Sequence, residues 1–97
     1  MVIRNMSQQA IAEIKSHIER SGGISALWSI GVTTNADQQL FSERKVNKET
    51  DWWIFRKFED HASALSGKNE LLKLGASDDN EVSQDHSDIL YAYKKSN

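Results

Sequence analysis

Residues 24–41 carry the sequence ISALWSIGVTTNADQQLF, in which a strand pattern passes directly into a helix pattern. In the first nine of these residues, apolar side chains fall mostly at every second position, which predicts a strand with one buried face. Thr34 and Asp37 then have the spacing of a capping box. A helix is therefore expected near residues 36–45.

The same periodicities predict the rest of the chain. Further elements are expected as a helix at 6–20, a strand at 51–57, a helix between Glu59 and Gly75, an acidic loop at 75–87 and a strand at 88–95. The strands are too few and too amphipathic for a sheet that is buried on both faces. We therefore predict a single α+β domain over residues 1–97, with a small three-stranded, largely antiparallel sheet covered by about three helices.

Composition excludes several classes of protein. The chain has no cysteine, which rules out disulfides, thiol catalysis and zinc sites built on cysteine. It has no apolar run of the ~18–20 residues that cross a bilayer, so no membrane association is expected. The start of the chain lacks the apolar segment of a signal peptide, and a cytoplasmic location is expected.

Charge is nearly balanced but unevenly distributed. The chain has 12 basic and 14 acidic residues, a net charge of −2, which argues against nucleic-acid backbone binding as its main task. Two groups are candidates for binding, with an ordinary solvated surface as the alternative. The basic group is Arg44, Lys45, Lys48, Arg56 and Lys57, and the acidic group is Asp78, Asp79, Glu81, Asp85 and Asp88.

The stretch Ser29–Asn35, followed by Gln39-Leu40, resembles the second half of the GIY-YIG nuclease signature. In that family a strand ending in Tyr-Ile-Gly runs through Thr and Asn into a helix with a catalytic Arg-Leu pair. The later order of a tryptophan-bearing strand and a helix also matches, so the resemblance covers residues 26–74. It implies a GIY-YIG-like fold and a site built around the Tyr-Ile-Gly strand.

The family's sequence pattern is degenerate and rearranged in this chain. The family's first strand, with its Gly-Ile-Tyr, is replaced here by the first helix. The terminal strand Ile89–Tyr93 is expected to take the missing edge of the sheet, as in a circular rearrangement. That placement would bring Tyr91 or Tyr93 near the site.

Three family positions carry different residues in this chain. Gly31 keeps the family glycine, but Ser29 stands at the tyrosine and Gln39 at the catalytic arginine. The metal-binding glutamate falls near Lys68, with Glu70 two residues away on another helical face. Hydrolysis of a phosphodiester needs a cation and usually a divalent metal. The substitutions therefore predict a lost reaction, unless the helix register differs and Glu70 is the ligand. A guanidinium and an acidic side chain that converge beside Ser29 and a tyrosine would overturn this prediction.

The aromatic and histidine residues give weaker signals. Trp28 is expected in the core, while adjacent Trp52 and Trp53 must point to opposite faces of a strand. One of that pair, with Trp53 as a candidate, is either covered or exposed as a contact anchor. His17 is expected in solvent among polar neighbours, and the histidine spacing predicts no metal site.

Three functions remain open from the sequence. The leading prediction is a non-catalytic GIY-YIG-like module that binds and regulates a protein partner, without a cofactor. The first alternative is a diverged, metal-dependent nuclease or nucleic-acid-binding domain. There the basic group would hold phosphates, with Tyr91 or Tyr93 and Glu70 at the centre. The second alternative is an inhibitor whose acidic loop mimics nucleic-acid charge.

Overall fold

The computed structural model describes residues 6–79 and 87–94 of the chain. Its elements are the helix α1 (Met6–Arg20), the strand β1 (Ser29–Thr33), the π-helical turn η1 (Gln38–Glu43), the strand β2 (Trp52–Lys57), the helix α2 (His61–Lys73) and the strands β3 (Ser77–Asp78) and β4 (Ile89–Lys94). The strands form one mixed sheet in the order β2-β4-β1-β3. The predicted α+β class is confirmed, with about three helical segments around the sheet.

Helix α1 spans the range predicted from its apolar stripe. Ala10, Ile14 and Ile18 are buried against the sheet. After Arg20 the chain turns through two glycines with φ of +108° and +99°, and the Gly23 N–H donates to the Ile18 carbonyl at 3.2 Å. Glycine accepts this left-handed conformation without a Cβ clash, so the helix ends there.

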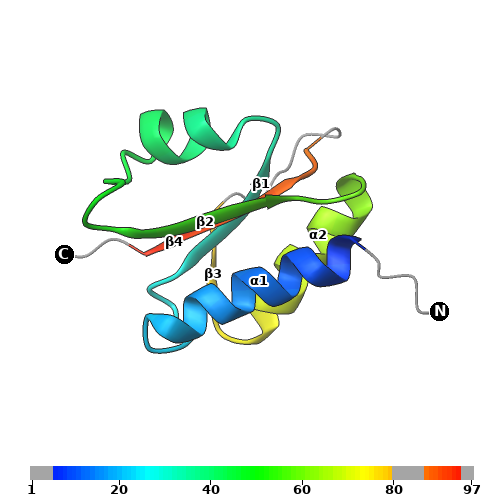
Figure 1. Cartoon of the computed structure of the whole chain (residues 1–97), viewed down its shortest axis with the longest axis horizontal. Coiled ribbons are helices and arrows are strands. Elements are labelled where there is room, and N and C mark those ends of the chain that lie inside the picture. The colour runs from blue at the N-terminus through cyan, green and yellow to red at the C-terminus, as the bar shows by residue number, and fades with distance from the viewer. Residues whose placement is uncertain (1–5, 80–86, 95–97) are drawn as a thin grey trace.

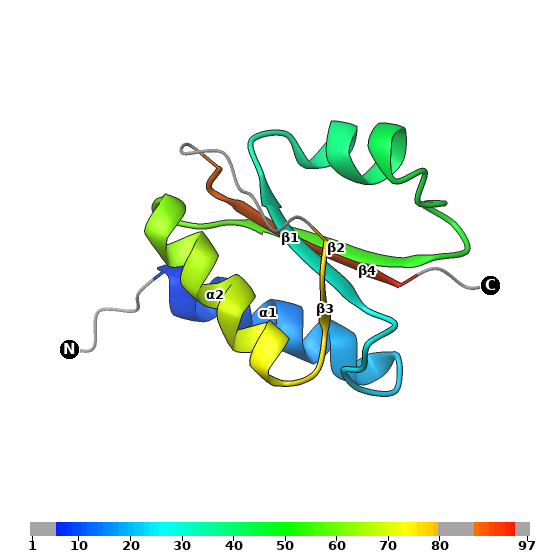
Figure 2. The same ribbon diagram turned by 180° about the vertical axis from the view of Figure 1, so that it is seen from behind.

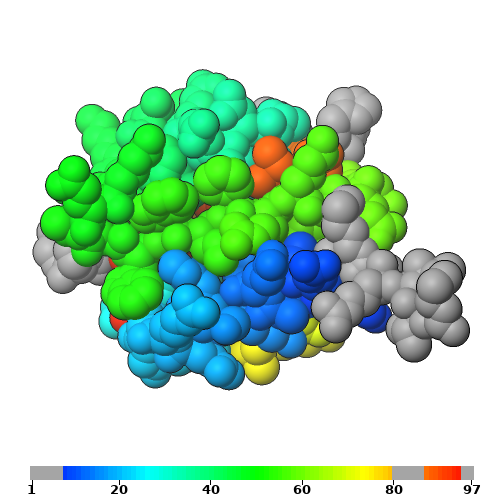
Figure 3. Space-filling view, in the orientation of Figure 1, coloured from blue at the N-terminus to red at the C-terminus, as the bar shows by residue number. Residues whose placement is uncertain are grey.

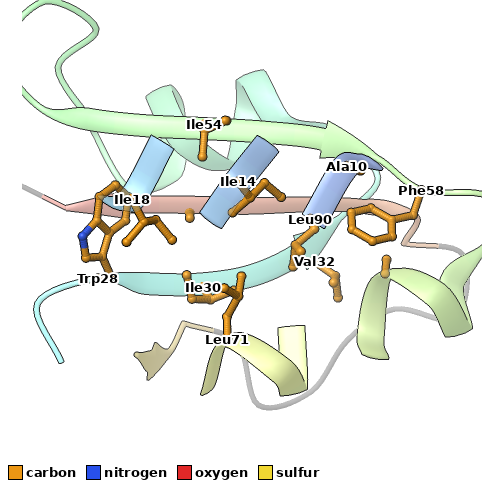
Figure 4. Close-up of a cluster of buried hydrophobic side chains, with 12 residues drawn as sticks. Ala10, Ile14, Ile18, Trp28, Ile30, Val32, Ile54, Phe58, Leu71 and Leu90 are labelled. Atoms are coloured by element: carbon orange, nitrogen blue, oxygen red, sulfur yellow. The ribbon is translucent and has the colours of Figure 1, made fainter. Parts of the chain in front are cut away.

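The sheet separates two layers of side chains. Helices α1 and α2 cover one face, and η1 lies over the other (Figure 1). Ile30 and Val32 of β1 point into the larger core, where they meet α1, α2 and Leu90 of β4 (Figure 4). The alternate residues of β4, Tyr91 and Tyr93, belong to a second cluster under η1. The period-2 pattern of these strands produces this division.

Helix α2 packs closely because it carries a glycine in the middle. Its N-cap, Asp60, accepts a hydrogen bond from the Ser63 N–H at 2.7 Å. A Cβ on Gly67 would lie 3.2 Å from atoms of both Phe58 and Leu90. The missing side chain therefore lets the helix approach the sheet.

The sheet has four strands instead of the predicted three, because residues 75–87 contain β3. The Ser77 N–H donates to the Trp28 carbonyl, and the Asp79 N–H to the Ile30 carbonyl, each at 2.8 Å. These bonds pair β3 parallel to β1, at the edge opposite to β2 (Figure 2). A strand of two residues is too short to show a sequence period.

The expected edge position of the terminal strand is wrong. Strand β4 is central, since it pairs antiparallel with β1 on one side and with β2 on the other. Its buried centre, from Leu90 to Tyr93, fits a strand with neighbours on both sides and cover on both faces. The free edges of the sheet are β2 and the short β3.

The helix predicted near residues 36–45 is shorter and wider than expected. After one helical step at residues 36–37, η1 forms a π-helical turn in which the Arg44 N–H bonds the Gln39 carbonyl at 3.0 Å. The Val46 N–H then bonds the Leu40 carbonyl at 2.9 Å. Leu40 and Val46 are buried beneath this turn. None of the helices in residues 6–79 and 87–94 has the length and apolar character to cross a membrane.

Candidate functional site

A group of polar side chains meets on the η1 face of the sheet. We call it the tyrosine cluster, and it consists of Ser29, Gln39, Arg44, Asp79, Tyr91 and Tyr93. Tyr91 and Tyr93 project from the same side of β4, and their rings stack at 6.3 Å with planes 10° apart. The predicted proximity of these tyrosines to Ser29 and Gln39 is what the geometry shows.

Asp79 lies at the centre of the tyrosine cluster. Its side chain is only 9% exposed. The carboxylate accepts hydrogen bonds from the hydroxyl of Tyr91, from the hydroxyl of Tyr93 at 2.8 Å and from Arg44 Nε at 2.9 Å. Burial of a carboxylate requires such compensation, and here one guanidinium and two neutral donors provide it.

Gln39 and Ser29 complete the cluster from the side of β1 and η1. The Gln39 side-chain amide donates to the Tyr91 hydroxyl at 3.1 Å. Ser29 lies opposite Tyr93 in the β1–β4 register, and Gly31 lies opposite Tyr91. The small residues on this face of β1 leave room for the tyrosine rings and the Asp79 carboxylate to meet across the strand.

The environment keeps both tyrosines protonated at neutral pH. Burial, together with the hydrogen bond to Asp79 and its charge, raises the pKa of Tyr93 to about 12. The same causes raise the pKa of the more deeply buried Tyr91 hydroxyl further. The hydrogen bond to Asp79 raises the pKa of Arg44 as well. The tyrosines therefore act as hydrogen-bond donors and not as bases.

A cation is present where the sequence predicted none. Gln39 stands at the family arginine, but the predicted lack of a positive charge at the site is wrong, because Arg44 brings its guanidinium there beside Asp79. A missing cation therefore no longer supports the predicted loss of the reaction. In an α-helix, residues five apart are separated by about 140° around the axis. The π-helical turn, with its bond from the Arg44 N–H to the Gln39 carbonyl, brings them to one face.

The two candidates for the metal-binding position lie away from the tyrosine cluster. Lys68 is buried and its ammonium is 2.8 Å from Asp78, whereas Glu70 pairs with Lys15 of α1 at 2.9 Å. Both project from α2, which covers the opposite face of the sheet from Tyr91. The geometry therefore gives no support to Glu70 as a ligand beside the tyrosines.

The members of the predicted basic group have different partners within the chain. Arg44 holds Asp79, while Lys48 and Arg56 both line a groove beside β2. Lys48 lies over the Phe41 ring with its ammonium 4.5 Å from the centroid, Arg56 pairs with Glu13 of α1 at 2.8 Å, and Lys57 is 3.9 Å from Asp88. Lys45 is exposed after η1 with a φ of 56°.

The predicted acidic group is mostly paired within the chain. Asp78 meets Lys68, Asp79 meets Arg44, and Asp88 lies near Lys57. Glu81 and Asp85 lie outside the described residues. The part of the chain that the structure describes contains no group of three or more His, Cys, Asp or Glu side chains that could hold a metal ion.

The tryptophans divide between core and surface. Trp28 is fully buried, as predicted, whereas Trp52 is 38% exposed. Trp53 is half-buried, and its indole N–H donates to the Lys48 carbonyl at 3.2 Å. His17 is half-buried between Trp28 and Trp52, in edge contact with both rings, so its predicted solvent exposure is wrong.

Comparison of the chain with protein-family models, curated proteins and solved structures finds no match. The function of the chain is therefore inferred from its own geometry.

Proposed function

We propose that this chain is a non-catalytic, GIY-YIG-like module that binds a protein partner. The observation that carries the proposal is that three donors, Tyr91, Tyr93 and Arg44, occupy three of the about four lone-pair sites of Asp79, the carboxylate of the tyrosine cluster. A general base or metal ligand needs a lone pair that faces the substrate or the ion. A metal ion at Oδ2 of Asp79 would have to displace Arg44 or Tyr91, and one at Oδ1 would have to fit beside the Tyr93 hydroxyl.

The protonation states support the same proposal. A tyrosine with a pKa near 12 holds its proton at neutral pH, so Tyr93 cannot activate water there. Arg44 is held by the carboxylate that neutralises it, which weakens its pull on a phosphate. The cluster is thus suited to fixing η1, β3 and β4 against one another.

One observation favours the nuclease alternative as a second candidate. Arg44, Gln39 and Tyr91 converge from different elements next to a carboxylate, a combination that could stabilise charge on a bound phosphate. In that case a substrate would displace Arg44 from Asp79 and a divalent metal would enter. The structure gives less support to an inhibitor that mimics nucleic-acid charge. Asp78, Asp79 and Asp88 each lie near a cation of this chain, which neutralises their charge.

A nicking assay on supercoiled plasmid with magnesium or manganese tests the proposal. We expect the parent protein to cleave no more plasmid than its Arg44→Ala and Tyr91→Phe variants. We also expect it to show no salt-sensitive binding of duplex DNA. Metal-dependent cleavage that both substitutions abolish would overturn the proposal in favour of the nuclease. Glu70→Gln is the matched control, because Glu70 lies on the opposite face of the sheet.

A further inference from the structure

Strand β2 presents an unpaired edge. The Phe58 N–H, directly after the strand, donates inward to the Asp88 carbonyl at 2.7 Å. Because backbone groups alternate in direction along a strand, the N–H and C=O groups of Trp53, Phe55 and Lys57 point outward. In residues 6–79 and 87–94, no strand pairs with this side of β2.

The outward edge lies in a groove. The groove has a volume of about 360 Å³, and α1 and η1 form its two walls. Its lining consists of His17 on α1, Asp37, Phe41 and Lys48 on the side of η1, and residues 53–56 of β2 along the floor. In Figure 3 the green side chains around β2 lie between the blue α1 and the segment that contains η1.

The two walls differ in chemistry. On the η1 side, Trp53 meets Phe41 edge-on at 5.1 Å and stacks with Phe55 at 6.2 Å, which makes an aromatic row. On the α1 side, the Arg56 guanidinium pairs with Glu13 at 2.8 Å, and the charges of Arg56 and Arg20 act on His17. An added strand has two faces, so its side chains would alternate between the aromatic row and the side of Arg56.

Side chains of this chain already form hydrogen bonds with some of the outward-pointing backbone groups of β2. Arg56 Nη1 donates to the Phe55 carbonyl at 2.8 Å. The imidazole of His17 is hydrogen-bonded to the backbone of Trp53. Exposed side chains of this kind protect an edge from aggregation, and they are displaced more easily than a paired strand because each makes few bonds.

We propose that an extended, acidic segment of a partner protein adds to β2 as a fifth strand, with apolar side chains on the aromatic row and carboxylates beside Arg56. This inference rests on the proposed protein-binding function and specifies the kind of partner. Main-chain bonds would supply the affinity and the alternating walls the selectivity. Partner carboxylates would compete with Glu13, which now holds Arg56 at 2.8 Å.

The geometry favours a peptide over a second copy of this chain. A second copy would bring its own β2, which lies between its own α1 and η1. Pairing of two such edges at the ~4.8 Å strand spacing would bring the α1 and η1 walls of both grooves against each other. A single extended segment meets no such obstacle.

The test uses a fluorescein-labelled nonapeptide of alternating glutamate and valine, followed by fluorescence anisotropy. We expect saturable binding, with loss of binding when alternate backbone nitrogens of the peptide are methylated. The matching lysine–valine peptide should bind at least tenfold more weakly. Arg56→Glu should weaken binding of the acidic peptide about tenfold, and Glu13→Gln should strengthen it a few-fold. Lys73→Glu, at the exposed end of α2, is the control with the same charge change.

Backbone pairing is tested by Lys57→Pro, which removes an outward N–H without touching the bonds to β4. It should abolish peptide binding, while Lys57→Ala retains it and both variants keep the native circular dichroism spectrum. Absence of binding up to about 1 mM peptide, or equal binding of the methylated peptide, overturns this inference. A dimer that Lys57→Pro dissociates overturns it in favour of a second copy. Plasmid cleavage by a protein that binds the peptide would overturn only the non-catalytic function.

Discussion

The hydroxyl of Tyr93 lies 2.8 Å from Oδ1 of Asp79, although Tyr93 is on β4 and Asp79 directly follows β3, on the other side of β1. The bond passes over β1 at the point where its residues on this face are Ser29 and Gly31. Gly31, opposite Tyr91 in this register, has no side chain on the face that the bond crosses.

Asp79→Asn should destabilise the protein by about 2 kcal/mol, since it replaces a charged, buried acceptor of three hydrogen bonds by an amide of the same shape. The Tyr93 pKa should fall below about 12 when the nearby charge is removed, but it should stay above its ordinary value because burial, the largest cause of the rise, remains. Urea unfolding and absorbance titration of the tyrosines measure the two effects. Asp37→Asn, on an exposed residue before η1, should change neither.

Stability should decline at alkaline pH. A tyrosine whose folded pKa is raised contributes stability that is complete below its unfolded value of about 10 and is lost as pH rises through the folded value. For Tyr93 this window runs from pH 10 to about 12. Unfolding free energies across this range should fall less steeply in Tyr93→Phe than in the parent protein. An equal decline of unfolding free energy with pH in the two proteins would contradict the raised pKa of Tyr93.

Lys68→Glu should destabilise the protein by about 3 kcal/mol or more, because it places a second carboxylate at a buried position beside Asp78. Lys68→Met should cost only about 1 kcal/mol, since Asp78 is partly exposed to water. Chemical denaturation compares the variants. Lys68→Glu should not produce plasmid cleavage in metal, because α2 and Tyr91 lie on opposite sides of the sheet.

His17 should make folding sensitive to mild acid. Burial, followed by the charges of Arg20 and Arg56, lowers its pKa below 6.5. The neutral imidazole is therefore favoured in the folded state, and its contribution to stability is complete above pH 6.5 and is lost as pH falls through the lowered value. Proton NMR titration should find a higher pKa in Arg56→Ala. Thermal unfolding of His17→Gln should depend less on pH between 5 and 7.

Much of the fold follows from periodicity. The stripe of Ala10, Ile14 and Ile18 predicts α1, and the alternation around Ile30 and Val32 predicts the buried face of β1. These patterns repeat over enough residues to specify one face. The order of the strands does not follow from them, because nothing in the period of Ile89–Lys94 indicates whether the strand is central or at an edge.

The tyrosine cluster was only half predictable. Tyr91, Tyr93, Ser29 and Gln39 follow from the motif and the strand pattern. Arg44 and Asp79 were assigned to surface charge groups, since one depends on a π-helical turn and the other on a two-residue strand. Neither feature has a sequence period, so tertiary packing alone brings these two charges together.

The central place of β4 has a consequence for synthesis on the ribosome. β1 and β2 do not pair with each other, and each finds its partner in residues 89–94. A nascent chain that has emerged only as far as α2 therefore holds two unpaired strands and half-covered apolar faces. Assembly of the sheet waits for its latest-made strand, which makes folding an event that follows translation of almost the whole segment.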